Sequence, residues 1–270
     1  MLEHPGPYPR VAADALGPEG ERLRGVLRDA GIGLLLARRS RRVPGGADAR
    51  GPGGAARSRR AWFALGGRMV AWDDLDPSTL ADRDWTSLSP ENAVPPAIPA
   101  SDPVLFVCTN GKRDACCALL GRPVAETLKL EGMPVWECSH IGGHRFAATA
   151  LLLPFGTVHG RLHAATARDL LESARDGRLH LPSLRGFSEL PEDAQAADIA
   201  VRESESIGGL VRMTVTSEGT QTRRDCEVGH PDGRRWRVRL TRGEGPPRPE
   251  SCGREPTSSE YWQVEHVERT

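Results

Sequence analysis

Four side chains with metal-binding chemistry, Cys108, Cys117, His140 and His144, are spaced so that they can meet at one end of a sheet. Cys108 ends the run VLFVC, which is typical of a strand buried on both faces. Cys117 follows in the first turn of a predicted helix, and His140 ends the next strand-like run, MPVWECSH. Two thiolates and two imidazoles are a full ligand set for zinc or for a two-iron cluster.

The segment between the two histidines is Ile141-Gly142-Gly143. Two histidines four positions apart would share one face of a helix, but two consecutive glycines disfavour a helix here. Glycine at both positions favours a loop whose backbone passes close to a bulky group. The sequence therefore predicts that His140 and His144 lie on a loop.

Three runs around these residues, CTNGKRDACC, WECSHIGGHRFAATALLLPFG and VHGRL, resemble the sucrase/ferredoxin-like family. The family pattern is a cysteine, a Gly-x-Arg-Asp element, a second cysteine and then His-x-Gly-Gly-His. The resemblance implies a thioredoxin-like domain with a [2Fe-2S] cluster held by Cys108, Cys117, His140 and His144. The register of the pattern selects Cys117, not its neighbour Cys116, as the second cysteine ligand.

A cluster held in this way implies an electron-transfer protein with an unidentified redox partner protein, in cytoplasmic redox metabolism or an oxidative-stress response. Neutral imidazoles in place of two thiolates make a cluster easier to reduce. We predict no catalytic residue, and an electron carrier is favoured over an enzyme with its own substrate. No pair of carboxylates stands out for sugar hydrolysis.

Two alternative functions remain open. A thioredoxin-like thiol oxidoreductase would use Cys108 and Cys117, although the chain has no Cys-x-x-Cys motif. A structural zinc site would use the same two cysteines and two histidines.

The other cysteines are predicted not to bind metal. Cys116 and Cys138 are interpreted as small buried hydrophobic residues, and Cys226 and Cys252 as non-ligands in a hairpin strand and a turn-rich segment. Arg113 is expected to be a charge near the site without a catalytic role.

The elements that must position these residues indicate an α/β (α+β) fold in three segments. Residues 1–100 form an N-terminal α/β segment, with a helix at 19–31 and a hairpin at Gly66-Gly67; this segment loosely echoes the next one, as a degenerate repeat would. Residues 101–190 form the thioredoxin-like ferredoxin domain. Residues 191–270 hold an exposed acidic helix and a C-terminal β-hairpin extension.

Two irregular segments lie within residues 1–103. Residues 38–60 are rich in arginine and glycine, typical of a mobile loop, with an acidic docking partner as the functional alternative. Residues 93–103 are proline-rich and are interpreted as a linker.

Composition narrows the class of protein. The 270 residues carry 36 basic and 36 acidic side chains, which argues against an electrostatic nucleic-acid binder. No apolar run is long enough to cross a bilayer, so no membrane is expected. The first residues show no basic and apolar secretory signal, so the expected location is the cytoplasm. The oligomeric state stays open.

Overall fold

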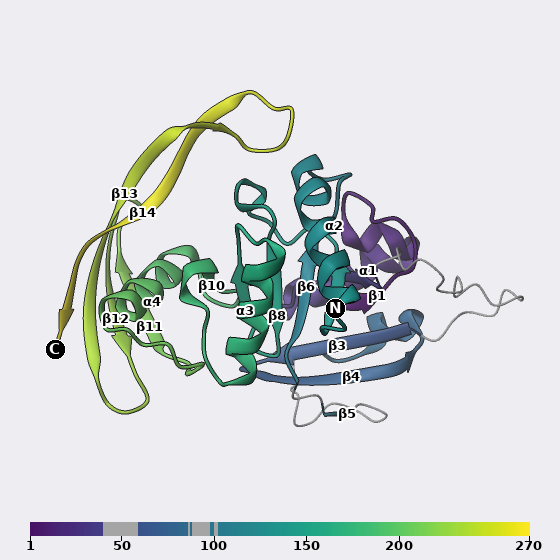
Figure 1. Cartoon of the computed structure of the whole chain (residues 1–270), viewed down its shortest axis with the longest axis horizontal. Helices are drawn as coiled ribbons and strands as arrows, with labels where there is room; N and C mark the ends of the chain where they lie inside the picture. The colour runs from purple at the N-terminus through teal and green to yellow at the C-terminus, as the bar shows by residue number, and fades with distance from the viewer. Residues whose placement is uncertain (40–58, 86, 88–97, 100–101) are drawn as a thin grey trace, which may run out of the picture.

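A computed structural model of the chain describes residues 1–39, 59–85, 87, 98–99 and 102–270 (Figure 1). Most of the arginine-rich segment and most of the proline-rich linker therefore lie outside the described residues. The fold is α+β, as predicted, with a mixed sheet and a separate antiparallel sheet.

The first sheet contains β1 (Leu2–Glu3), β2 (Leu36–Arg38), β3 (Arg59–Leu65), β4 (Arg68–Leu75), β5 (Ile98–Pro99), β6 (Val104–Cys108), β7 (Val135–Cys138), β8 (Ala150–Leu153), β9 (Thr157–His159) and β10 (Leu184–Phe187). The second sheet contains β11 (Thr214–Gly219), β12 (Arg223–Gly229), β13 (Arg235–Pro249) and β14 (Pro256–Arg269). The α-helices are α1 (Pro18–Asp29), α2 (Ala115–Leu130), α3 (Ala164–Arg175) and α4 (Glu192–Ser204). Short 3-10 helices are η1 (Ala12–Leu16), η2 (Pro77–Asp82), η3 (His144–Phe146) and η4 (Leu181–Ser183).

The strands of the first two predicted segments pair into one sheet, in the order β10-β9-β8-β6-β7-β2-β1-β3-β4-β5. At its centre β6 and β7 run parallel, with Cys108 opposite Cys138, and α2 makes the crossover between them. β2 pairs antiparallel with β7, so the N-terminal strands continue the sheet directly.

The two faces of β6 pack against different parts of the chain. Leu105 and Val107 belong to the core that α2 and α3 cover. Phe106 faces the other side, where the indole of Trp62 from β3 lies edge-on with the ring centroids 5.2 Å apart. The alternation of side chains along β6 therefore places both faces of the strand in a core, as the apolar run predicts.

The helix at 192–204 differs from the exposed helix that its acidic sequence predicts. One face of α4 packs against the second sheet, with Ala197 and Val201 in the same core as Trp236. Asp198 and Arg202 are also fully buried and form an ion pair at 2.8 Å. Arg202 also donates hydrogen bonds to the carbonyls of Gly209 and Val211. These tertiary partners allow the guanidinium to be buried, although the sequence predicts that it faces solvent.

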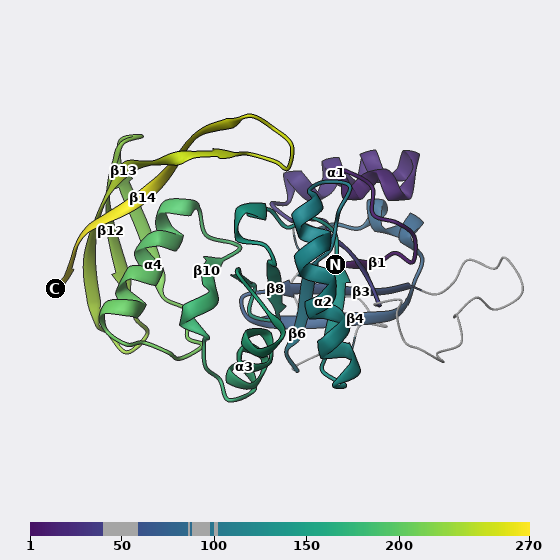
Figure 2. The same ribbon diagram turned by 45° about the horizontal axis from the view of Figure 1, so that its top comes forward.

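The segment predicted to be turn-rich forms a long ribbon. β12 pairs with β13 only as far as Thr241, and beyond that point β13 and β14 pair with each other alone, ending at Pro249 opposite Pro256. We call residues 242–263 the arm. It curves from the C-terminal sheet toward α2 (Figures 1 and 2).

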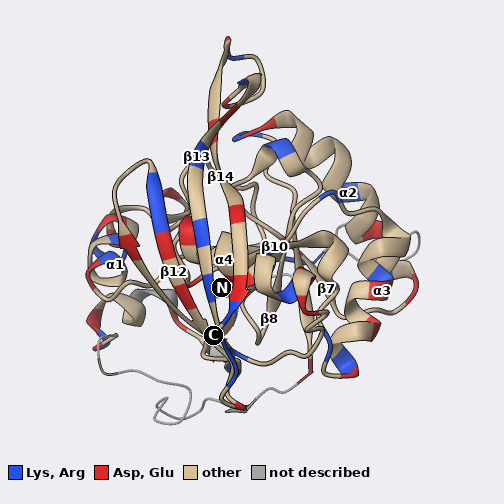
Figure 3. Cartoon of the chain, turned by 90° about the vertical axis from the view of Figure 1, so that its left-hand side faces the viewer, with Lys and Arg blue, Asp and Glu red and all other residues tan. Residues whose placement is uncertain are grey.

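The two prolines at 246 and 247 sit in an irregularity of this ribbon, where the register shifts between Gly245 and Arg248. A bulge tolerates residues that cannot donate to a ladder, so the prolines do not stop the pairing. Charged side chains of both signs line the exposed face of β12, β13 and β14 (Figure 3). Within the described residues, no helix is long and apolar enough to span a membrane.

Candidate metal centre

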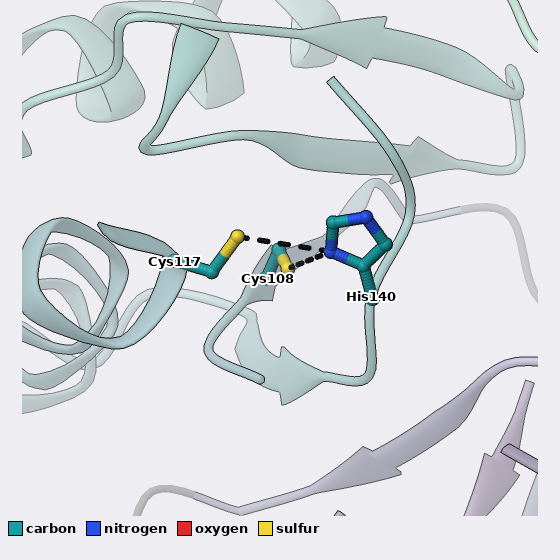
Figure 4. Close-up of side chains that lie close together, drawn as sticks. All are labelled: Cys108, Cys117 and His140. Atoms are coloured by element: carbon teal, nitrogen blue, oxygen red, sulfur yellow. Dashed lines mark hydrogen bonds between the residues drawn. The ribbon is translucent and has the colours of Figure 1, made fainter. Parts of the chain in front are cut away.

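Cys108, Cys117 and His140 meet at one end of the first sheet (Figure 4). Cys108 is the last residue of β6, Cys117 lies in the first turn of α2, and His140 follows β7. The Nδ1 atom of His140 is 3.9 Å from the sulfur of Cys108 and 3.7 Å from that of Cys117. Both sulfurs are fully buried, and the His140 side chain is 18% exposed. The parallel β6-α2-β7 unit thus brings three soft ligand atoms together, as the sequence predicts.

The close approach of α2 to the end of β6 depends on a glycine. A Cβ atom at Gly121 would lie 2.1 Å from the carbonyl oxygen of Cys108. The sequence leaves open a kink or restart near Gly121 and Pro123, but α2 runs unbroken from Ala115 to Leu130. Gly121 therefore allows the helix to carry Cys117 directly over Cys108.

The two buried thiols shift each other's pKa in opposite directions. The hydrogen bond from Cys117 lowers the pKa of Cys108 to about 5; burial opposes this shift, and His140 and the backbone N–H groups of Asn110 and Ile141 support it. The same hydrogen bond, together with burial, raises the pKa of Cys117. Thiolates are the form of cysteine that binds metals, so Cys108 is already prepared to do so.

Asp114 lies between the two predicted histidine ligands. Its side chain is 2% exposed, with Oδ2 3.8 Å from Nε2 of His140 and Oδ1 4.0 Å from Nδ1 of His144. Asp114 occupies the N-cap position of α2, but its carboxylate caps no N–H group of the helix.

The carboxylate of Asp114 instead binds the tip of the arm. It accepts a hydrogen bond from the hydroxyl of Ser251 and one from the backbone N–H of Cys252 at 2.9 Å. Burial by itself would raise the pKa of Asp114, but these two hydrogen bonds and the nearby histidines hold that pKa below its usual value. Asp114 is therefore a buried anion that links the arm to both histidines.

A second group of ligand atoms lies on the other side of Asp114. The ring of His144 is grouped there with Cys116 and Cys252, and its Nδ1 atom is 3.8 Å from the sulfur of Cys116. The sulfurs of Cys116 and Cys252 are 3.2 Å apart. Burial, followed by the contact with Cys252, raises the pKa of Cys116 to about 11.

The predicted ligand set is thus divided between two neighbouring groups. Cys108, Cys117 and His140 lie in the first group, and His144 lies in the second. The two histidine rings nevertheless face the same carboxylate, that of Asp114. The buried Nε2 atom of His144 has no hydrogen-bond partner among the residues that the structure describes. An unpaired buried nitrogen is costly, and a bound metal would satisfy it.

The segment between the histidines is a loop, as predicted, and His144 itself begins the short 3-10 helix η3. Gly142 and Gly143 have φ angles of 90° and 63°, a conformation that favours glycine, so this segment is a loop and not a helix. A Cβ atom at Gly142 would meet nothing within 4 Å among the described residues. The positive φ angles by themselves favour glycine at both positions.

The first group is chemically suited to a metal ion. Donors bonded at about 2.1–2.3 Å to one tetrahedral metal lie about 3.5–3.8 Å apart, close to the 3.7 and 3.9 Å between His140 and the two sulfurs. Cysteine sulfur and imidazole nitrogen are the ligands that zinc and iron–sulfur centres use. The Cys and His groups of this chain could therefore hold a metal ion.

The remaining expectations concern residues outside the first group. Cys138 and Cys226 are fully buried among apolar side chains, which agrees with a packing role. Arg113 is exposed. The charged group that faces the two histidines is the carboxylate of the next residue, Asp114.

Sequence reasoning missed the part that the arm plays in the site. Cys252 is predicted to be a non-ligand and Cys116 a buried hydrophobic residue, but the two sulfurs lie with His144 in a second group that could hold a metal ion. A signal in the sequence is that Cys252 stands in a polar, proline-rich segment, where few apolar neighbours are available to bury it.

A buried ion pair beside the site was also missed. Glu137 of β7 accepts hydrogen bonds from Arg38 at 2.7 Å and from the hydroxyl of Thr109 at 2.7 Å. An acidic residue within the apolar run of β7 is the feature that could have indicated a buried partner.

Comparison with known proteins supports the resemblance seen in the sequence. Residues 56–186 match the family model described as Sucrase/ferredoxin-like. Searches of curated proteins and of solved structures found no match. The matched region contains Cys108, Cys117, His140 and His144, and it ends before α4 and the arm. Residues 56–186, just under half of the chain, are therefore similar to the sucrase/ferredoxin-like family.

Proposed function

We propose that this protein is an electron carrier with a [2Fe-2S] cluster bound by Cys108, Cys117, His140 and His144. The observation that carries the proposal is the convergence of two buried sulfurs and the Nδ1 atom of His140 at the end of β6. The family match and the unpartnered Nε2 atom of His144 support the fourth ligand. When bound, such a cluster supplies a one-electron redox centre.

The protein's own residues suit this role in two ways. The sulfur ligands are buried, whereas His140 and His144 are 18% and 14% exposed, so the imidazole side of the site lies nearer to solvent. Asp114 faces Nε2 of His140 while Nδ1 points at the sulfurs, an arrangement that favours a proton on Nε2 and leaves Nδ1 free for a metal.

A zinc site is the second candidate function. The separations of 3.7 and 3.9 Å between His140 and the two sulfurs are those of ligands on a single tetrahedral ion, which favours one metal with three of these ligands. A thiol oxidoreductase would instead cycle Cys108 and Cys117 between dithiol and disulfide. The two sulfurs lie within 4.8 Å of each other, so the experiment below also tests this alternative.

The test is the composition and spectrum of the full chain purified without oxygen. We expect about two irons and two acid-labile sulfides per chain, visible absorbance, and a paramagnetic signal after one-electron reduction. One zinc per chain and no visible absorbance would establish the zinc site instead. Metal-free protein in which oxidation links Cys108 to Cys117 would support the thiol oxidoreductase.

A further inference from the structure

The tip of the arm holds the sulfur of Cys252 against that of Cys116, 136 positions away in the chain, at a distance of 3.2 Å. Two thiolates on one tetrahedral zinc lie about 3.7 Å apart, whereas the sulfurs of a disulfide are about 2.05 Å apart. The observed contact is thus shorter than the separation in a shared metal site. A small movement of either side chain would bring the two sulfurs to bonding distance.

The backbone of the arm is anchored where this contact occurs. The N–H group of Cys252 and the hydroxyl of Ser251 both donate hydrogen bonds to the buried carboxylate of Asp114, two residues before Cys116. These bonds hold the tip of the arm in place whether or not the sulfurs are joined. The folded structure therefore already brings Cys116 and Cys252 together, so forming a disulfide would cost little further conformational entropy.

The two cysteines also differ in their access to solvent. Cys252 is exposed, and Cys116 is partly buried beneath it. A small oxidant in solution would therefore meet Cys252 first, and Cys116 would then be the neighbouring thiol that resolves the product.

We propose that Cys116 and Cys252 form a reversible disulfide that fastens the tip of the arm over the N-terminal end of α2. The oxidant is a low-molecular-weight disulfide. The sulfur of Cys252 attacks it, forms a mixed disulfide and releases one small thiol. The sulfur of Cys116 then attacks the Cys252 sulfur and releases the second small thiol, so two protein thiols are oxidised and one small disulfide is reduced to two thiols.

The disulfide would act on the edge of the metal centre, whichever metal that centre holds. Cys116 contacts the ring of His144, and the anchored arm covers Asp114. Oxidation would hold the arm closed over this edge, and reduction would leave it attached only by the hydrogen bonds to Asp114. Exposed disulfides are readily reduced, as a reversible switch requires.

The experiment equilibrates the full chain with oxidised and reduced glutathione at several ratios, quenches it with acid, alkylates the free thiols and maps the peptides by mass spectrometry. Trypsin is expected to release one peptide at 114–129, with Cys116 and Cys117, and another at 243–254, with Cys252. We expect these peptides to be cross-linked in most chains under oxidising conditions, and the link to be lost on reduction. The link should fall to background in Cys116→Ser and Cys252→Ser and persist in Cys117→Ser. Fragmentation of the wild-type cross-linked pair locates the sulfur even if Cys117→Ser does not fold.

Three outcomes would overturn the proposal. One is a link between Cys117 and Cys252. Another is a stable mixed disulfide on Cys252 that Cys116 never resolves. The third is a pair of thiols protected by a metal that co-purifies with the wild type and is lost in Cys252→Ser. The assay measures cross-links and not iron, so its result is independent of the cluster proposal.

Discussion

The backbone N–H of Cys252 donates a hydrogen bond to the carboxylate of Asp114 at 2.9 Å, across 138 positions of the chain. The acceptor is a buried anion that also faces His140 and His144. The arm thus contributes to the environment of both histidines, although it lies outside the region that matches the family.

Replacing Asp114 with alanine should release the tip of the arm. A hydrogen bond to a charged group contributes about 1.5–3 kcal/mol, so the amide of Cys252 should exchange with deuterium about 10- to 100-fold faster in Asp114→Ala. Hydrogen-exchange mass spectrometry of the reduced protein measures this change. Asp225→Ala is the control because Asp225 forms an exposed ion pair with Arg239 and should not affect the arm. Unchanged exchange at Cys252 would show that Asp114 does not hold the arm.

The adjacent cysteines of α2 should behave oppositely toward the metal. Cys117 is fully buried and faces His140, whereas Cys116 contacts Cys252. We expect Cys117→Ser to lose the bound metal and visible absorbance, and Cys116→Ser to retain both. Metal analysis and absorbance of the two variants, purified in parallel, check this. The reverse pattern would assign the ligand to Cys116.

Replacing His144 with cysteine tests the fourth ligand. If His144 binds the cluster, the change exchanges a neutral imidazole for an anionic thiolate and should lower the reduction potential by on the order of 100 mV. Redox titration followed by visible absorbance measures the shift. His163→Cys, at an exposed histidine, is the matched control. An unchanged potential in His144→Cys would mean that His144 is not bound to iron.

Gly121 should be intolerant of any side chain. Its Cβ would lie 2.1 Å from the carbonyl of Cys108, so Gly121→Ala must push α2 away from β6. Overpacking of this kind costs about 1–3 kcal/mol of unfolding free energy, and the displaced Cys108 should also weaken metal binding. Urea unfolding and metal content provide the measurements.

Gly25 is the matched control, because it lies in α1 and a Cβ there would meet nothing within 4 Å among the described residues. Gly25→Ala should stabilise the protein by about 0.5–1 kcal/mol, since alanine favours the helix. Equal stability of the two variants would contradict the close contact between α2 and β6.

His159 should make the protein sensitive to mild acid. Burial, with a smaller contribution from His180, lowers the pKa of His159 from 6.5 to about 3. Its two ring nitrogens contact the hydroxyls of Ser183 and Thr157, each at 2.9 Å. Because the pKa is depressed in the folded state, the unfolded chain binds the proton first, and stability is lost as pH falls from about 6.5 toward 3.

Between pH 7 and pH 5 this effect should remove about 2 kcal/mol of unfolding free energy. Urea unfolding at the two pH values measures the loss of unfolding free energy. In His159→Gln the part of this loss that is due to His159 should disappear. The same substitution at the exposed His163 is the control. An identical loss in His159→Gln and the wild type would exclude His159 as the cause.

The convergence of Cys108, Cys117 and His140 could be predicted because their positions follow from local pattern, whereas the choice of Cys117 over Cys116 came from the family resemblance. Cys108, Cys117 and His140 lie at the ends of successive elements of one β-α-β unit, and parallel strands bring such ends together. The two glycines of the histidine loop likewise predicted a loop, because consecutive glycines disfavour a helix in any context.

The second ligand group could not be predicted because it depends on pairing between distant segments. Cys252 reaches Cys116 only through the register of β13 and β14, and prolines 246 and 247 made that ribbon look like a series of turns. The burial of α4 was missed for a similar reason. Asp198 and Arg202 have the spacing of an exposed helical ion pair. The hydrogen bonds that Arg202 donates to the carbonyls of Gly209 and Val211 offset the desolvation cost of burying the pair, and these bonds depend on tertiary structure.

The order of strands in the first sheet has a consequence for the family region itself. β1 and β2 precede residue 56 in the chain, yet they lie between β7 and β3, which both belong to the matched region. A fragment cut to residues 56–186 would lose two inner strands, leave β7 and β3 with unpaired backbone groups, and be expected to aggregate through those edges. A fragment made to carry the candidate metal centre should therefore include β1 and β2 as well as the matched region.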